Sequence, residues 1–78
     1  MKPKTNPIAK QIAKDGISYN NKQIKKLETE IKKWQTARKK FVVEKIGAAV
    51  KGVDEVINHH KKMIEKYNNE NKKLKKRL

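Results

Sequence analysis

The chain has 78 residues, which is enough for one small domain. It contains no cysteine, so disulfide bonds, thiol catalysis and cysteine-based zinc sites are excluded. With 35% hydrophobic against 38% charged residues, the composition is too polar for a globular core but typical of long helices that each bury one stripe. The sequence therefore predicts an all-α protein. We expect a homo-oligomer, because so small a core stabilises a single chain only weakly.

The charge is strongly positive. Twenty-two Lys and Arg residues against eight Asp and Glu residues give a net charge of +14, and residues 1–16, 17–46 and 47–78 each carry part of the excess. Such a charge attracts polyanions, and a bound polyanion relieves the repulsion between the cations. Nucleic acid is therefore the predicted partner, and an acidic protein is the alternative.

No apolar run approaches the roughly 20 residues that span a bilayer, and the first ten residues lack the apolar stretch of a secretory signal. We expect the cytoplasm as the location. A membrane-surface helix over residues 39–57 is a minor alternative, which the acids Glu44, Asp54 and Glu55 oppose. Twenty lysines against two arginines suggest an AT-rich coding sequence, as in a phage or plasmid.

Residues 1–16 are predicted to form a basic N-terminal arm. Within it, residues 8–16 can form a short helix, with Pro7 at the first helical position and Gly16 at the C-terminal cap. Ser18 could then cap the next helix. A short helix, a glycine and a second helix also suggest a helix-turn-helix motif, although the third helix of such a domain is missing.

Apolar residues at a spacing of 3.5 predict a long helix over residues 18–46. Arg38 stands where this pattern would place an isoleucine, so it either weakens the core or points toward a partner. Trp34 could stack on nucleotides, but its heptad position favours the core. The two heptad positions of this seam hold Ile17, Ile24 and Ile31, and Leu27, Trp34 and Phe41.

A second helix is predicted over residues 53–78. Its apolar seam does not continue the heptad frame of the first helix. Either residues 47–52 form a turn between two antiparallel helices, or one long helix bends at this glycine-containing patch. We favour the hairpin, alone or as a coiled-coil dimer, because the helices would be equally long and acids would open the second. Asn71 is predicted to specify the register of the helices and the formation of a dimer. The second seam holds Val53, His60, Tyr67 and Leu74, and Ile57, Ile64, Asn71 and Leu78.

Three lysine doublets recur every seven residues on the face opposite the first seam. On a helix they form a stripe about 20 Å long, which suits contacts with backbone phosphates and reads no base sequence. A second basic cluster lies at the end of the chain. The predicted nucleic-acid-binding residues are Lys25, Lys26, Lys32, Lys33, Lys39 and Lys40 in the first cluster, and Lys72, Lys73, Lys75, Lys76 and Arg77 in the second.

Nothing in the sequence predicts catalysis, a metal site or a cofactor. His59 and His60 are adjacent, so on a helix they point about 100° apart and cannot bind one metal together. No nucleophile, base and orienting group stand in a recognisable pattern, and no glycine loop suits a phosphate. We therefore expect a non-enzymatic accessory protein that binds DNA or RNA. The alternative is a helical module that docks on an acidic or nucleic-acid-processing protein through its Trp34 and Phe41 edge.

Residues 26–34 and 38–50 combine a heptad helix, a basic run and an apolar patch that contains Gly47. In this order of features the chain resembles small accessory proteins of plasmid mobilisation. The resemblance implies an origin on a mobile element.

Overall fold

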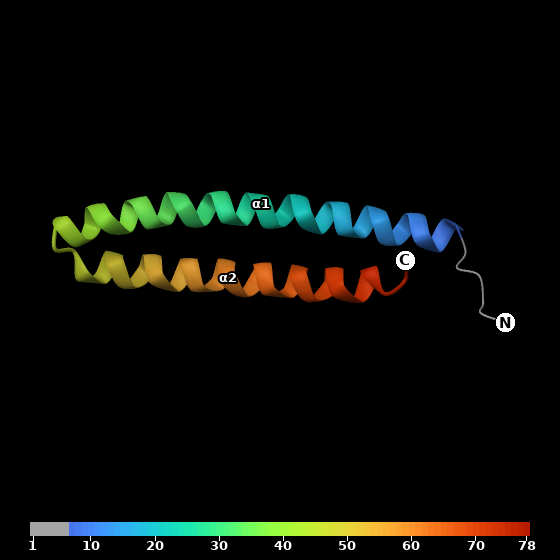
Figure 1. Ribbon diagram of the computed structural model, residues 1–78. Coiled ribbons are helices and arrows are strands. Elements are labelled where there is room, and N and C mark those ends of the chain that lie inside the picture. Colours follow the sequence, from blue (N-terminus) through green and yellow to red (C-terminus); the bar gives the residue numbers. More distant parts are fainter. Residues whose placement is uncertain (1–6) are drawn as a thin grey trace.

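A computed structural model describes residues 7–78 as two long helices. Helix α1 (Pro7–Val43) and helix α2 (Gly47–Lys75) lie side by side and antiparallel, joined by residues 44–46 (Figure 1). The molecule is a rod with extents of 65 × 15 × 11 Å. The predicted all-α hairpin is confirmed, and the alternative of one long bent helix is wrong.

Helix α1 begins at Pro7, where a proline costs nothing because the first helical N–H has no partner within the helix. It then continues through Gly16 and Ser18 without a break, so the predicted short helix, the cap at Ser18 and the helix-turn-helix motif are wrong. Packing explains the difference, because Ala13 is fully buried and Leu74 of α2 lies against Gly16. Of the predicted arm, residues 1–6 lie outside the described residues.

The turn lies at residues 44–46 and not at the predicted residues 47–52. The N–H of Ile46 donates to the carbonyl of Phe41 at 3.0 Å, and the N–H of Lys45 donates to the carbonyl of Val42 at 3.1 Å. Lys45 has a φ of 58°, in the left-handed region. These bonds form a Schellman motif, which ends a helix and satisfies its last carbonyls. A lysine occupies the place where glycine is usual, so the sequence did not mark the turn.

Replacing Lys45 with glycine should stabilise the hairpin by about 0.5–1 kcal/mol. A left-handed residue with a side chain costs about 1–2 kcal/mol, and the extra freedom of glycine in the unfolded chain offsets part of the gain. The melting temperature, followed by far-UV circular dichroism, should rise by several degrees. A lower melting temperature would contradict the left-handed conformation at this position.

The two glycines that suggested a turn belong to α2, since Gly47 begins the helix and Gly52 lies in its second turn. Nothing lies within 4 Å of a Cβ added at Gly52, whereas a Cβ at Gly16 would lie 2.8 Å from the Cδ1 of Leu74. Glycine inside a helix costs about 0.5–1 kcal/mol relative to alanine. We therefore expect G52A to raise the melting temperature and G16A to raise it less or lower it, as measured in parallel thermal melts. Equal gains would show that Gly16 is not needed for close packing.

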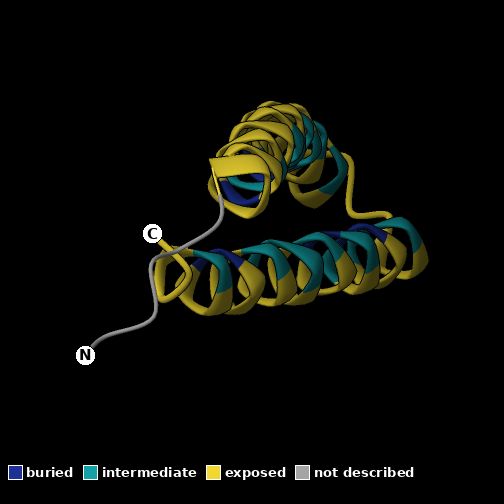
Figure 2. Cartoon of the chain, turned by 90° about the vertical axis from the view of Figure 1, so that its right-hand side faces the viewer, coloured by how far each residue is buried: buried dark blue, intermediate teal, exposed yellow. Residues whose placement is uncertain are grey.

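The sides of α1 and α2 that face each other carry the buried residues, and the outer sides are exposed (Figure 2). Every apolar position of the two predicted seams is at least half-buried except Leu78. No large side chain is fully buried in the described part of the chain, because two helices cover each other on one side only. Three contacts show that the antiparallel helices pair in one register, because the two residue numbers of each contact add up to nearly the same value, 90, 91 or 92. The pairs are Gly16 with Leu74, Asn20 with Asn71, and Arg38 with Asp54.

The core contains a layer of asparagines. Asn20 is 2% exposed and Asn71 is 5% exposed. The Nδ2 of Asn20 donates to the Oδ1 of Asn71 at 3.0 Å, and the Nδ2 of Asn71 donates to the Oδ1 of Asn21 at 3.0 Å. Because a buried amide without a partner is costly, this layer favours the one register that pairs the two helices here. Asn71 thus pairs the two helices of one chain.

Candidate nucleic-acid interface

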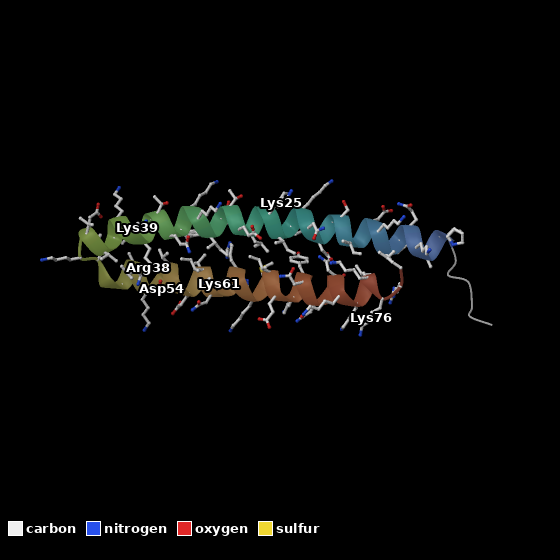
Figure 3. All side chains as sticks on the ribbon, viewed as in Figure 1. Lys25, Arg38, Lys39, Asp54, Lys61 and Lys76 are labelled. Atoms are coloured by element: carbon white, nitrogen blue, oxygen red, sulfur yellow. The ribbon has the colours of Figure 1, made fainter. Side chains whose placement is uncertain are left out.

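All eleven predicted binding residues have exposed side chains. The six lysines at residues 25, 26, 32, 33, 39 and 40, here called the lysine stripe, lie on α1 away from the seam. Figure 3 places Lys25 and Lys39 on α1, Lys61 on α2, and Lys76 just beyond the end of α2. Residues 72, 73, 75, 76 and 77, the tail cluster, lie at the end of α2 and just beyond it.

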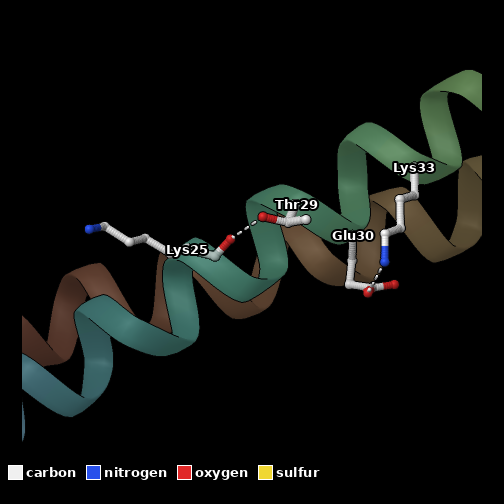
Figure 4. A network of polar contacts seen from close by, with 4 residues as sticks. All are labelled: Lys25, Thr29, Glu30 and Lys33. Atoms are coloured by element: carbon white, nitrogen blue, oxygen red, sulfur yellow. Dashed lines mark hydrogen bonds and ion pairs between the residues drawn. The ribbon is translucent and has the colours of Figure 1, made fainter.

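Two threonines of the helix beneath the lysine stripe bond back to the preceding turn. The hydroxyl of Thr29 donates to the carbonyl of Lys25 at 3.0 Å, and that of Thr36 donates to the carbonyl of Lys32 at 3.1 Å. Figure 4 shows the Thr29 bond, with the ammonium of Lys25 extending away from the helix. Such bonds satisfy the hydroxyls within the helix and do not stabilise it. Because α1 is continuous over these residues, the lysine stripe repeats at intervals of about 10 Å along it.

Acidic residues neutralise little of the lysine stripe. Within residues 7–78 there are two ion pairs, Lys33 with Glu30 at 3.6 Å and Arg38 with Asp54 at 2.7 Å. The side chains of Lys33 and Glu30 are 71% and 47% exposed, so water screens their attraction. In the described part of the chain, the other five lysines of the stripe have no carboxylate within 4 Å.

Arg38 forms an ion pair with the second helix. Its Nε donates to the Oδ1 of Asp54 on α2, and both side chains are about half exposed (Figure 3). We expected Asp54 in the first turn of the second helix, where its carboxylate would interact favourably with the helix dipole. Because α2 begins at Gly47, Asp54 lies about two turns after the start of the helix. The pair instead joins the two helices near the turn.

The antiparallel arrangement brings the tail cluster next to the first half of α1. There the structure forms a groove of about 520 Å³. Two predicted residues line it, Lys25 of the lysine stripe and Lys75 of the tail cluster, together with Lys14 and Lys22. Lys14 and Lys22 could not be predicted from the sequence, because their closeness to Lys75 depends on the register of the hairpin. The rest of the stripe lies further along α1, so the hairpin joins the two clusters only in part.

The two histidines are neighbours on α2. His60 is half-buried and its Nδ1 is 2.9 Å from the carbonyl oxygen of Val56, one turn earlier. The ring of exposed His59 stands edge-on to that of His60, with the centroids 6.3 Å apart. Within residues 7–78, no three His, Asp or Glu side chains are placed to hold one metal ion.

Comparison with known proteins gives no relative: no family model matches the sequence, and no curated protein or solved structure is significantly similar to it. Across residues 7–78, neither helix combines the length and apolar character needed to cross a membrane. The function must therefore be argued from the charges and surfaces of this chain.

Proposed function

We propose that this protein binds DNA or RNA through the phosphate backbone, with little dependence on base sequence, and that it is an accessory protein and not an enzyme. One observation carries the proposal: the lysine stripe presents six exposed ammonium groups along α1, and within residues 7–78 only Lys33 among them has an acidic partner. The closely spaced ammonium groups repel one another. A polyanion bound along the helix would attract each of them and so offset this repulsion.

The dimensions of the lysine stripe suit a nucleic acid. Its length of about 20 Å corresponds to roughly a dozen phosphates of duplex DNA, which carries one charge per 1.7 Å of axis. Each lysine that contacts a phosphate releases condensed counterions, so the affinity should fall steeply with salt. Lysine acts here as a point charge, and the stripe contains none of the Arg, Asn or Gln side chains that most often read base edges. Binding should therefore be similar for unrelated sequences.

The apolar seam between the two helices is only partly covered, and this supports self-association. Trp34, Phe41 and Tyr67 are only half-buried in the hairpin. A second hairpin packed on this side would remove more apolar surface from water, at about 25 cal/mol per Å². We therefore propose a homodimer, which light scattering should detect as twice the monomer mass of 9.1 kDa. A monomer mass at high protein concentration would contradict it.

A protein partner is the second candidate, and the turn end of the rod favours it. Val43 is 80% exposed, Val42 50% and Ile46 44%. Exposed apolar groups clustered at one end are typical of contact sites between proteins. An acidic partner that stays bound after nuclease treatment, and that V43D releases, would support this function over nucleic-acid binding.

The proposed function is tested by fluorescence anisotropy with two labelled duplexes of unrelated sequence and the corresponding RNA. At low salt all should bind with similar affinity, and at physiological salt the dissociation constants should lie in the range of about 10⁻⁶–10⁻⁴ M that is usual for non-specific binding. Absence of any complex at low salt would rule the function out. A large preference for one sequence would contradict backbone recognition.

A further inference from the structure

A groove at the open end of the hairpin, which is the end away from the turn, combines cations with an apolar floor. Lys14, Lys22 and Lys25 of α1 and Lys75 of α2 contribute four ammonium groups. Among the residues that the structure describes, none places a side-chain carboxylate within 4 Å of these lysines, and no acidic residue lines the groove. Its volume of about 520 Å³ lies within the range of about 300–1,000 Å³ that is usual for small-molecule sites.

The floor of the groove is aliphatic. Ile17 lies there half-buried at the edge of the seam, and Leu78 is 47% exposed beside it. The methylene stems of the lysines extend this apolar surface while their ammonium groups stay in water. Asn21 adds a polar group, since its Oδ1 accepts from Asn71 while its Nδ2 makes no hydrogen bond. The groove therefore suits a ligand with phosphates next to an apolar face, and it offers one amide donor.

A duplex does not present that combination. Its base faces are stacked on one another, and its outer surface shows phosphates and sugars. In a single strand the base faces are unstacked and lie next to the phosphates, so an apolar surface beside cations can cover part of a base or sugar face. The lysine stripe, in contrast, is purely cationic and does not distinguish the two forms.

We infer that the groove holds an unstacked single-stranded segment of the bound nucleic acid, with its phosphates on Lys14, Lys22, Lys25 and Lys75 and a sugar or base face on Ile17 and Leu78. This inference rests on the proposed function and refines it. The protein contacts duplex phosphates with the lysine stripe and prefers single-stranded regions at the open end of the hairpin. Because Lys25 belongs to both surfaces, one strand can run continuously from the stripe into the groove.

The test compares a short single-stranded oligonucleotide with a duplex of the same sequence, using two variants of equal charge. The groove variant is K14Q/K22Q/K75Q, which keeps Lys25 because that residue also belongs to the lysine stripe. The control variant, K10Q/K51Q/K61Q, removes three exposed lysines that do not line the groove. Both variants lower the net charge equally, so any difference between their affinities shows the effect of where the removed lysines lie. Circular dichroism verifies that each stays helical.

We expect the groove variant to bind the single strand at least tenfold more weakly than the control variant does, with duplex affinities that agree within about threefold. L78S, at an exposed position, should weaken single-strand binding about fivefold and leave duplex binding unchanged. Equal losses of single-strand affinity in the two variants would overturn the inference and leave the proposed function standing. If the wild-type protein binds neither form at low salt, the proposed function fails as well.

Discussion

Replacing all six lysines of the stripe with glutamine should lower the affinity for duplex DNA at least a hundredfold at about 0.1 M salt. Each ammonium that releases a counterion contributes nearly tenfold at this concentration. The stripe has two columns of three lysines, and a duplex that follows one column already makes three such contacts. Glutamine is polar and has nearly the helix propensity of lysine, so the hairpin should stay folded.

The matched control removes six lysines from elsewhere, as K10Q/K45Q/K51Q/K61Q/K62Q/K66Q, all of them exposed. Anisotropy titrations should show a much smaller loss for this variant, because these lysines do not form one continuous stripe. If both variants lose the same affinity, the total charge decides binding and the arrangement on α1 has no special role.

Replacing Asn71 with leucine should lower the melting temperature by roughly 5–20 °C. The substitution leaves the Nδ2 of Asn20 without a partner at a site that is 2% exposed. An orphaned buried amide costs about 1–3 kcal/mol, and 1 kcal/mol shifts the melting temperature of so small a domain by about 4–8 °C. Thermal melts followed by circular dichroism measure the change.

The double variant N20L/N71L provides the control. With both amides gone, two apolar side chains face each other and no buried polar group is orphaned, so stability should return to the wild-type level or exceed it. The coupling energy from the double-mutant cycle should then be large. A melting temperature of N71L equal to that of the wild type would show that the asparagine layer does not stabilise the observed register.

The sequence predicted the seams well because burial on a helix follows the heptad period. Ile24, Val53 and Ile57 are buried as their positions required. The exposure of the lysine stripe follows from the same period, since residues opposite a buried seam must face water. The type of each element, and the choice of a hairpin, could thus be read from spacing and helix length.

The turn and the groove could not be predicted from spacing. The turn depends on Lys45 in a left-handed conformation, which lysine adopts only at a cost, while Gly47 and Gly52 gave a misleading turn signal. The groove depends on Lys14 and Lys75, which are far apart in the sequence and meet only in the observed register. Gly16 shows the same dependence, because its role is to admit Leu74 of the opposite helix.

The most direct measurement is the dependence of duplex affinity on salt, recorded for two unrelated sequences. If three to six lysines of the stripe contact phosphates, the logarithm of the affinity should fall against the logarithm of the salt concentration with a slope between about −3 and −5, the same for both sequences. A slope near zero would mean that the bound surface is not the exposed lysines, and nucleic-acid binding through the phosphate backbone would then be wrong.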